Sequence, residues 1–346
     1  MKKCNCTCFI VPPYIVEYME KHGQVKISEE NLQAEKSFRE ARSKKIDALN
    51  AASAAPEVLG ASLRKVYDCK NRRLLRKNLV RSEGQAPVAD QVVNAVYDNT
   101  GIVREFYKTQ YNWISFDNNG GTLHLNVHYL SNYNNAGWDG DEMVFGDGDG
   151  VIFVNLGNSL DVTGHEITHG VIQYTANLVY SKQPGALNEH MADVFGVTIR
   201  QFTQGQSSSP STANWLIGDS IMGPTLQGQA LRNMKAPGTA YNNVYMGQDP
   251  QPDHMSNYYT GSSDNYGVHI NSGIPNKVFY LVSVAFGDTL KAALLWFETL
   301  KVMTSTDNFA TFKTRILAKA TTLESQGKIP VGSGAMITSS FAVVGL

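Results

Sequence analysis

The sequence predicts an α+β protein with two lobes, a small β-rich part followed by a mainly α-helical part. Residues 65–160 contain short apolar runs separated by turn-forming Gly, Asp and Asn residues. Beyond residue 161 helical patterns dominate, apart from an irregular stretch over residues 203–262. The length of 346 residues suits at least two domains. We expect a leader and linker over 1–54, a β-rich region over 55–160 and a helical region over 161–346.

Each expected element has a local signal. Residues 123–129 alternate in period two, as a half-buried strand does. Other strand-like and helical segments precede and follow this one, and a turn is expected over 180–185. The other strand-like runs are 65–68, 74–80 and 143–145, and the helical runs are 17–50, 87–106, 161–169 and 186–195. Ser28 is a candidate N-cap, and the small-residue run 51–56 is typical of a linker that proteases cut.

Composition limits the kinds of partner. The chain is 42% hydrophobic and 18% charged, which is enough apolar material for a sizeable core. Its 30 basic and 31 acidic residues nearly balance, so we expect no nucleic acid partner. No apolar run approaches the roughly 20 residues that span a bilayer, so we expect no membrane partner. Pro12, Pro13 and Glu17 interrupt any apolar segment near the N-terminus, which argues against an ordinary signal peptide.

The cysteines indicate no disulfide framework. Cys4, Cys6 and Cys8 crowd the N-terminus, whereas Cys69 stands alone. The three clustered thiols lack the second Cys or His pair of a zinc ribbon. Exposed thiols in the leader are the simpler interpretation, with a temporary zinc ligand as the alternative.

The residues that indicate chemistry begin at His165. His165 and His169 are four apart, so on a helix they lie on one face and can hold a single ion. Glu166 is displaced by roughly 100° and lies beside that ion without binding it. Imidazole suits Zn²⁺, and a catalytic zinc takes three protein ligands with a fourth position for water.

A second helix supplies the missing ligand. Glu189 follows His169 by twenty positions, and Asp193 lies one turn further on the same face. Two antiparallel helices can therefore bring Glu189 to the ion, while Asp193 accepts the second ring N–H of a ligating histidine. Ligation by two histidines and a distal Glu, with a further Glu left free, is the arrangement of a metalloprotease. A metzincin would need Gly and His where this chain has Ile172 and Thr175.

Five ordered motifs resemble those of thermolysin-like zinc metalloendopeptidases. They span 133–138, 143–150, 164–171, 185–189 and 264–273, and the resemblance runs from about residue 66 to the C-terminus. The leader, with the sequence Ile-Val-Pro-Pro-Tyr-Ile over 10–15, resembles the short propeptide of the protealysin branch. The resemblance implies a two-lobed thermolysin-like fold with one catalytic zinc ion in the cleft between the lobes.

The resemblance also implies roles for individual residues. Glu166 takes a proton from the zinc-bound water and passes it to the leaving amine. Tyr180 and His269 donate hydrogen bonds to the oxyanion of the tetrahedral intermediate, and Asp264 orients His269.

Further residues match positions that hold the substrate. Asn135 and Ala136 match residues that pair with an extended peptide backbone, and Arg232 matches one that binds a carbonyl next to the cut. Four apolar residues match the walls of the pocket for the side chain after the cut: Phe153, Leu156, Val162 and Leu231. The resemblance therefore implies cleavage on the N-terminal side of bulky hydrophobic residues.

The chain departs from the family at a calcium site. Asp161 and Asp219 match calcium-binding carboxylates, but Arg200 stands where a Glu is expected and Leu216 occupies another ligand position. An Arg there can meet both carboxylates directly. We therefore expect one calcium ion at most.

These observations predict a zinc-dependent neutral endopeptidase that acts on peptides or proteins. We expect residues 1 to about 50 to lie across the cleft as an intramolecular inhibitor and to be removed near 51–55, with a permanent interaction segment as the alternative. We expect a monomer that is secreted without an ordinary signal peptide; a cytoplasmic protein is the alternative.

Two other classes of protein remain open. One is a binding protein that kept the fold without the activity, although the intact Glu166 and His269 disfavour it. The other is a zinc aminopeptidase. That class places its third ligand one residue earlier, where this chain has Asn188, and needs acidic residues to capture a free amine.

Overall fold

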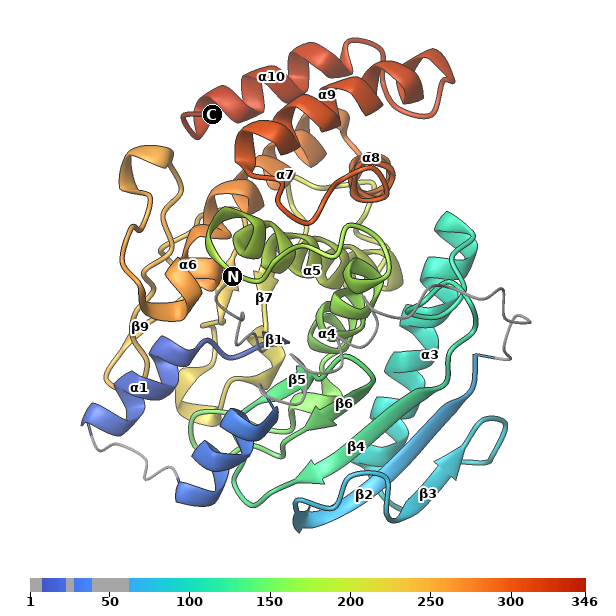
Figure 1. Cartoon of the computed structure of the whole chain (residues 1–346), viewed down its shortest axis with the longest axis vertical. Helices are drawn as coiled ribbons and strands as arrows, with labels where there is room; N and C mark the ends of the chain where they lie inside the picture. Colours follow the sequence, from blue (N-terminus) through green and yellow to red (C-terminus); the bar gives the residue numbers. More distant parts are fainter. Residues whose placement is uncertain (1–7, 23–27, 39–61) are drawn as a thin grey trace.

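The computed structural model describes residues 8–22, 28–38 and 62–346, which form two lobes (Figure 1). A sheet and the long helix α3 (Gln91–Tyr111) build one lobe, and a bundle of helices builds the other. The predicted α+β class and the order of the two parts are confirmed. No helix within the described ranges is long and apolar enough to cross a membrane.

The sheet has six strands in the order β1-β5-β6-β4-β2-β3. β4 (Leu123–Tyr129) lies in the middle, pairs in parallel with β2 and β6, and has the bounds that its alternating sequence predicts. The other pairs are antiparallel. The remaining strands are β1 (Cys8–Phe9), β2 (Arg64–Arg72), β3 (Leu79–Ser82), β5 (Ala136–Trp138) and β6 (Glu142–Phe145).

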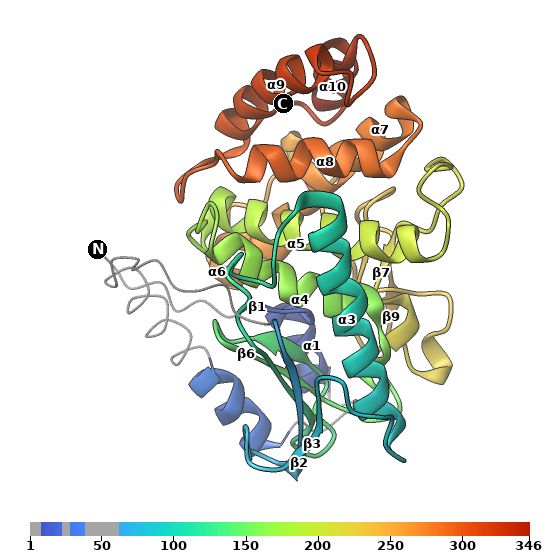
Figure 2. The same ribbon diagram turned by 90° about the vertical axis from the view of Figure 1, so that its right-hand side faces the viewer.

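Helix α3 lies against this sheet, as the view in Figure 2 shows. It begins after Asp90, whose carboxylate accepts hydrogen bonds from the first-turn N–H groups of Val92 and Val93. It ends at Asn112, a residue in the left-handed conformation. The sequence placed this helix at 87–106, so both ends were wrong by four to five residues because capping decides them.

Two buried helices form the centre of the helical lobe. α4 (Leu160–Gln173) and α5 (Lys182–Thr203) pack closely where Gly164 faces Gly196. A Cβ atom on Gly196 would lie 2.6 Å from the carbonyl oxygen of Asp161, closer than atoms can pack. Glycine at this position therefore sets how near α5 comes to α4.

The turn expected at 180–185 is shorter than predicted. α5 already begins at Lys182 and contains Pro184 and Gly185 in its first turn. Proline is tolerated there because the first N–H groups of a helix have no intrahelical partner.

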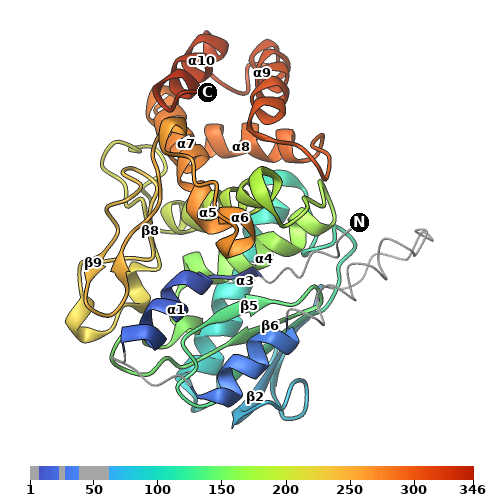
Figure 3. The ribbon, with the colours of Figure 1, turned by 60° about the vertical axis from the view of Figure 1, so that its left-hand side comes forward.

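Five further helices complete this lobe (Figure 3). They are α6 (Ser263–Asn271), α7 (Gly273–Phe286), α8 (Thr289–Leu300), α9 (Phe309–Ser325) and α10 (Ser333–Val343). The stretch 203–262 is irregular, as predicted, and holds only short elements. These are the strands β7 (Leu216–Ile217), β8 (Arg232–Asn233), β9 (Asn242–Asn243) and β10 (Gly247–Gln248), with short 3-10 helices at Asp219–Ile221, Pro224–Leu226 and Met255–Asn257; another, Leu156–Asn158, precedes α4.

The leader is docked onto both lobes. Strand β1 pairs with β5 at the edge of the sheet, and α1 (Pro13–His22) contacts α6 (Figure 3). Ile10, Ile15 and Met19 are fully buried. Residues 29–38 form a second helix, and Ser28 Oγ accepts a hydrogen bond from Asn31 N at 3.1 Å, as expected of an N-cap.

The expected linker at 51–56 lies outside the described residues, and so do Cys4 and Cys6. Cys69 is a buried free thiol. Burial raises its pKa to about 12, which makes it unreactive.

Candidate metal centre

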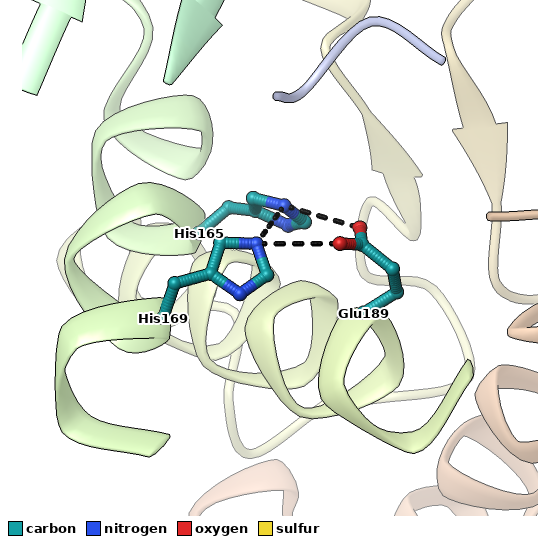
Figure 4. Close-up of side chains that lie close together, drawn as sticks. All are labelled: His165, His169 and Glu189. Atoms are coloured by element: carbon teal, nitrogen blue, oxygen red, sulfur yellow. Dashed lines mark hydrogen bonds and ion pairs between the residues drawn. The ribbon is translucent and has the colours of Figure 1, made fainter. Parts of the chain in front are cut away.

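Three side chains converge between α4 and α5. The ligand atoms of His165, His169 and Glu189 all lie within 4.8 Å of one another, the one such group among the residues that the structure describes. The two Nε2 atoms are 3.0 Å apart, and each is 3.4 Å from one oxygen of Glu189 (Figure 4). All three residues are buried.

Neighbouring groups decide which ring nitrogens carry protons. Nδ1 of His165 lies 2.9 Å from Asp193 Oδ1, and Nδ1 of His169 lies 2.8 Å from Asn188 Oδ1. Both partners are acceptors, because Asn188 Nδ2 is already committed to the carbonyl of Leu178. Both Nδ1 atoms therefore donate, and in the neutral rings that bind a metal both Nε2 lone pairs point at the same place.

Two lone pairs facing each other beside a carboxylate need a cation between them. Two imidazoles and one carboxylate are the ligands that a catalytic zinc takes, so the donor set fits Zn²⁺. The electrostatics agree. Burial disfavours a charged His165, yet its hydrogen bonds to Asp193 and Glu189 raise its pKa to about 9. The site thus favours positive charge at this point.

Asp193 connects the histidine to an arginine. Its Oδ1 accepts from His165 Nδ1 and from Arg232 Nη2 at 2.8 Å, and its Oδ2 accepts from Arg232 Nε and Asn276 Nδ2, both at 2.9 Å. Burial would raise the pKa of this carboxyl, but Arg232 and His165 outweigh burial and lower it to about 2. Asp193 is therefore ionised and fixes both partners.

Sequence reasoning placed Asp193 beside a ligand histidine but missed its other contacts. No motif in the sequence indicates Asn276, which lies 83 positions after its partner Asp193. Asn188 was considered only as the ligand position of an aminopeptidase. It holds His169 instead, and its place next to Glu189 was the one available signal.

Glu166 lies in the same helical turn as the first ligand. It is completely buried, as are the residues on either side of it in α4. A carboxylate in this position is shielded from bulk water, which strengthens its interaction with a proton or cation nearby.

A second group of side chains lies against Glu189. Tyr180 O–H donates to Glu189 Oε1, and its oxygen is 3.2 Å from His269 Nε2. His269 Nε2 is also 3.4 Å from Glu189 Oε2. Asp264 binds His269 twice, through Nδ1 at 2.6 Å and through the backbone N–H at 2.7 Å. The structure therefore brings Tyr180, His269 and Asp264 together at the third ligand.

An unusual backbone turn positions Asp264. Four consecutive residues have left-handed torsion angles: Asp264 (φ 54°), Asn265 (φ 51°), Tyr266 (φ 66°) and Gly267 (φ 80°). This conformation costs about 1–2 kcal/mol for each non-glycine residue. It lets both oxygens of one carboxylate reach the residue five positions further along the chain.

The residues that matched substrate-binding positions contact the leader. Ile10 N donates to Ala136 O at 3.1 Å, and Ile10 O accepts from Arg232 Nη1 at 3.0 Å. Asn135 exchanges two hydrogen bonds with the backbone of Val11, at 3.0 and 3.3 Å. The leader thus follows the path on which these residues would hold a peptide.

The four expected pocket walls are buried, and so is Ile10 of the leader. All five side chains belong to the large apolar core, which extends through both lobes, and each has an exposed fraction of zero. The four are Phe153, Leu156, Val162 and Leu231.

The expected calcium position contains a guanidinium group. Arg200 Nη1 donates to Asp161 Oδ2 at 2.7 Å and to Asp219 Oδ1 at 2.8 Å, and Nη2 donates to the carbonyl of Leu216. Gly218 N donates to Asp161 as well, at 3.0 Å. Arg200 therefore provides positive charge between the two carboxylates.

The chain is similar to known proteins along nearly all of its length. Residues 20–173 match the family described as thermolysin metallopeptidase, catalytic domain, and residues 176–345 match its alpha-helical domain. The "Extracellular metalloprotease" of Pectobacterium carotovorum subsp. carotovorum is 38% identical over 86% of this chain and 85% of that protein. "Thermolysin" of Bacillus sp. (strain EA1) is 36% identical over 81% of this chain and 50% of that protein.

A solved structure has a similar fold over nearly the whole chain. The "Precursor of Protealysin, Metalloproteinase from Serratia proteamaculans" superposes with a TM-score of 0.82 and 36% identity, covering 98% of this chain and 99% of that one. The family matches, these relatives and the His-His-Glu group all indicate a zinc metallopeptidase. The chain therefore belongs to the thermolysin family of zinc metallopeptidases, hydrolases that act on peptide bonds.

Proposed function

We propose that this metallopeptidase is an endopeptidase made as a zymogen, with Glu166 as its general base. The observation that carries the proposal is the meeting of the His165 and His169 lone pairs beside Glu189. Zinc bound by these residues supplies a Lewis acid and a water molecule of lowered pKa. Proton transfer and stabilisation of the developing negative charge are carried out by other side chains of the protein.

Glu166 accepts a proton from the attacking water and donates it to the nitrogen of the leaving amine. His269 and Tyr180 stabilise the negative oxygen that develops on the scissile carbonyl. The contacts of both side chains with Glu189 support this assignment, because they lie next to the metal ligand without being ligands themselves. Asp264 holds His269 in orientation.

Substrates are peptides or proteins that bind in an extended conformation. Asn135 and Ala136 pair with the backbone, and Arg232 binds the carbonyl of the residue after the cut. The contacts of these residues with the leader backbone support their roles. Because the pocket walls are apolar, bulky hydrophobic side chains are favoured after the cut.

The leader is the intramolecular inhibitor in this proposal. Its residues 9–11 engage the side chains that would bind a substrate, so both cannot bind at once. Removal near residues 51–55 frees the cleft.

The name "Extracellular metalloprotease" of a relative that matches along most of its length supports secretion. The position of Arg200 supports a requirement for one calcium ion at most, since its single positive charge already offsets part of the negative charge of Asp161 and Asp219.

Peptide hydrolysis with and without metal tests the function. The substrate is an N-acylated peptide with one internal Leu, and the enzyme is the chain after leader removal. Chelation is expected to abolish cleavage before Leu, and zinc to restore it.

Glu166→Gln is expected to bind zinc by metal analysis but to lose at least about a hundredfold in kcat. Retained turnover in Glu166→Gln would contradict the mechanism, and a strict need for a free N-terminus would indicate an aminopeptidase. Full specific activity in the intact chain would exclude a zymogen.

A further inference from the structure

The leader crosses the site in one defined direction. β1 runs antiparallel to β5, with Cys8 opposite Trp138 and Phe9 opposite Gly137. Beyond the strand, the backbone of Ile10 and Val11 continues along Ala136 and Asn135. The chain direction matters because it fixes the order in which carbonyl and N–H groups meet the residues around the metal centre.

The peptide bond between Phe9 and Ile10 lies between His269 on one side and Ala136 and Arg232 on the other. The carbonyl oxygen of Phe9 is 3.2 Å from His269 Nε2, the atom assigned to the oxyanion. The next N–H, that of Ile10, donates to Ala136 O, and the next carbonyl accepts from Arg232. The Phe9–Ile10 bond therefore occupies the scissile position. A leader running in the reverse direction would not present a carbonyl to His269 and the N–H of the next residue to Ala136.

The side chains on both sides of this bond are held in place. Ile10 is fully buried and belongs to the large apolar core that also contains the four pocket walls. Phe9 is buried on the other side, where its ring stacks on Phe38 at 5.0 Å and meets Tyr133 edge-on at 6.5 Å. A bulky apolar residue thus follows the bond, as the proposed specificity requires. Fixing a reactive bond beside its catalytic groups is a large part of catalysis.

We infer that Phe9–Ile10 is a self-cleavage site, hydrolysed within the same molecule when zinc binds and before the linker is cut. The inference rests on the proposed function. The oxygen of water adds to the Phe9 carbonyl carbon, and the bond to the Ile10 nitrogen breaks. Glu166 carries one water proton to that nitrogen. The second water proton leaves the new carboxyl group and is taken up by the Ile10 amine. The products are therefore the Phe9 carboxylate and the Ile10 ammonium group, and water is the one co-reactant.

The first cut releases only part of the inhibitor. Residues 1–9 lose their covalent link, and β1 is then held by its pairing with β5 and by the packing of Phe9 against Phe38 and Tyr133. The part from residue 10 onwards keeps the hydrogen bonds of Val11 to Asn135, and Glu35 Oε1 accepts from Asn135 Nδ2 at 3.2 Å. Self-cleavage therefore precedes full activity, and the second cut, in the linker, completes it.

Intact-mass measurement tests this inference on the full-length chain. The chain is prepared with a chelator, zinc is added, and samples are quenched with time. We expect loss of residues 1–9 and a new N-terminus at Ile10. The rate constant is expected to stay the same over a tenfold dilution, because the reaction is intramolecular. Glu166→Gln is expected to bind zinc and to remain uncut.

Two substitutions of one residue provide matched variants. Ile10→Leu keeps a bulky apolar side chain, so the cut is expected at the same bond. Ile10→Asp would bury a charge in the apolar pocket, so cleavage there is expected to fall at least about a hundredfold. Hydrolysis of the N-acylated peptide is measured for each variant after protease removal of its leader, which shows that the catalytic part is folded.

The results separate this inference from the function on which it rests. A wild-type chain that hydrolyses the N-acylated peptide but keeps the Phe9–Ile10 bond throughout activation overturns the inference alone. So does a rate that rises in proportion to protein concentration, or an Ile10→Asp chain cut at this bond as fast as Ile10→Leu. A chain that hydrolyses neither bond overturns both proposals.

Discussion

Arg200 lies between two carboxylates that would otherwise repel each other at the start of α4. Its side chain is almost completely buried, and so is that of Asp161. Replacing it by methionine leaves the buried carboxylate without its partner, so Arg200→Met is expected to lower the free energy of unfolding by about 3 kcal/mol. Urea denaturation measures the loss, and added calcium is expected to restore part of it.

A solvent-exposed pair provides the control for this substitution. Lys301 contacts Glu298 at 2.6 Å with more than a third of its side chain exposed. Lys301→Met is expected to cost no more than about 1 kcal/mol and to show no response to calcium. Equal stability of Arg200→Met and the wild-type protein would show that Arg200 does not stabilise these carboxylates.

Single residues also show where sequence reasoning reached its limit. Helical spacing alone placed Asp193 near the ligands, because residues four apart share a face. Tyr180 and His269 were found only through the family resemblance, since an isolated tyrosine or histidine carries no sign of its partner. Asn188 and Asn276 were missed because an amide that orients a ligand looks like any other polar residue.

At the level of elements, the distance between α4 and α5 determines whether Glu189 reaches the two histidines. Gly196→Ala places a Cβ 2.6 Å from a backbone oxygen of α4, which cannot move without shifting the helix. We expect it to lower stability by about 1–3 kcal/mol and zinc affinity about tenfold, since the ligands separate. Calorimetry and competition with a zinc chelator measure the two effects.

Gly334 in α10 gives a matched helical control. A Cβ there meets no atom within 4 Å, so Gly334→Ala is expected to change stability by less than about 1 kcal/mol and zinc affinity not at all. Unchanged zinc affinity in Gly196→Ala would mean that α5 tolerates displacement without moving its ligand.

Elements with a strong local pattern were predictable, and those that depend on distant partners were not. β4 has its predicted bounds because alternation is a local property. The strand expected at 74–80 is wrong for most of its length: the strand in the structure is Leu79–Ser82, the part of the chain that pairs with β2. β1 was not predicted at all. Its two residues become a strand through pairing with β5, more than a hundred residues away along the chain.

At the level of the whole molecule, the leader links the two lobes. It pairs with β5 of the sheet and reaches Arg232 and His269 of the helical lobe. The helix 29–38 secures this position through the stacking of Phe38 on Phe9. Phe38→Ala is expected to weaken the docked leader and to raise the initial rate of N-acylated peptide hydrolysis by the full-length chain severalfold.

Leu32 lies in the same helix but is partly exposed, with an exposed fraction of 36%. Leu32→Ala is therefore the control and is expected to leave the initial rate nearly unchanged. The rates are read from the first minutes of progress curves, before processing is complete. An initial rate in Phe38→Ala equal to that of the wild-type chain would show that this ring does not hold the leader.

The pairing of β1 with β5 has a consequence for strand addition. While the leader is present, β1 occupies the main-chain edge of β5, so no other strand can pair with β5 there. Once β1 departs, the main-chain groups of Ala136–Trp138 are open to another strand. The edge is only three residues long, which is enough to align a short extended peptide but too little to seed a fibril.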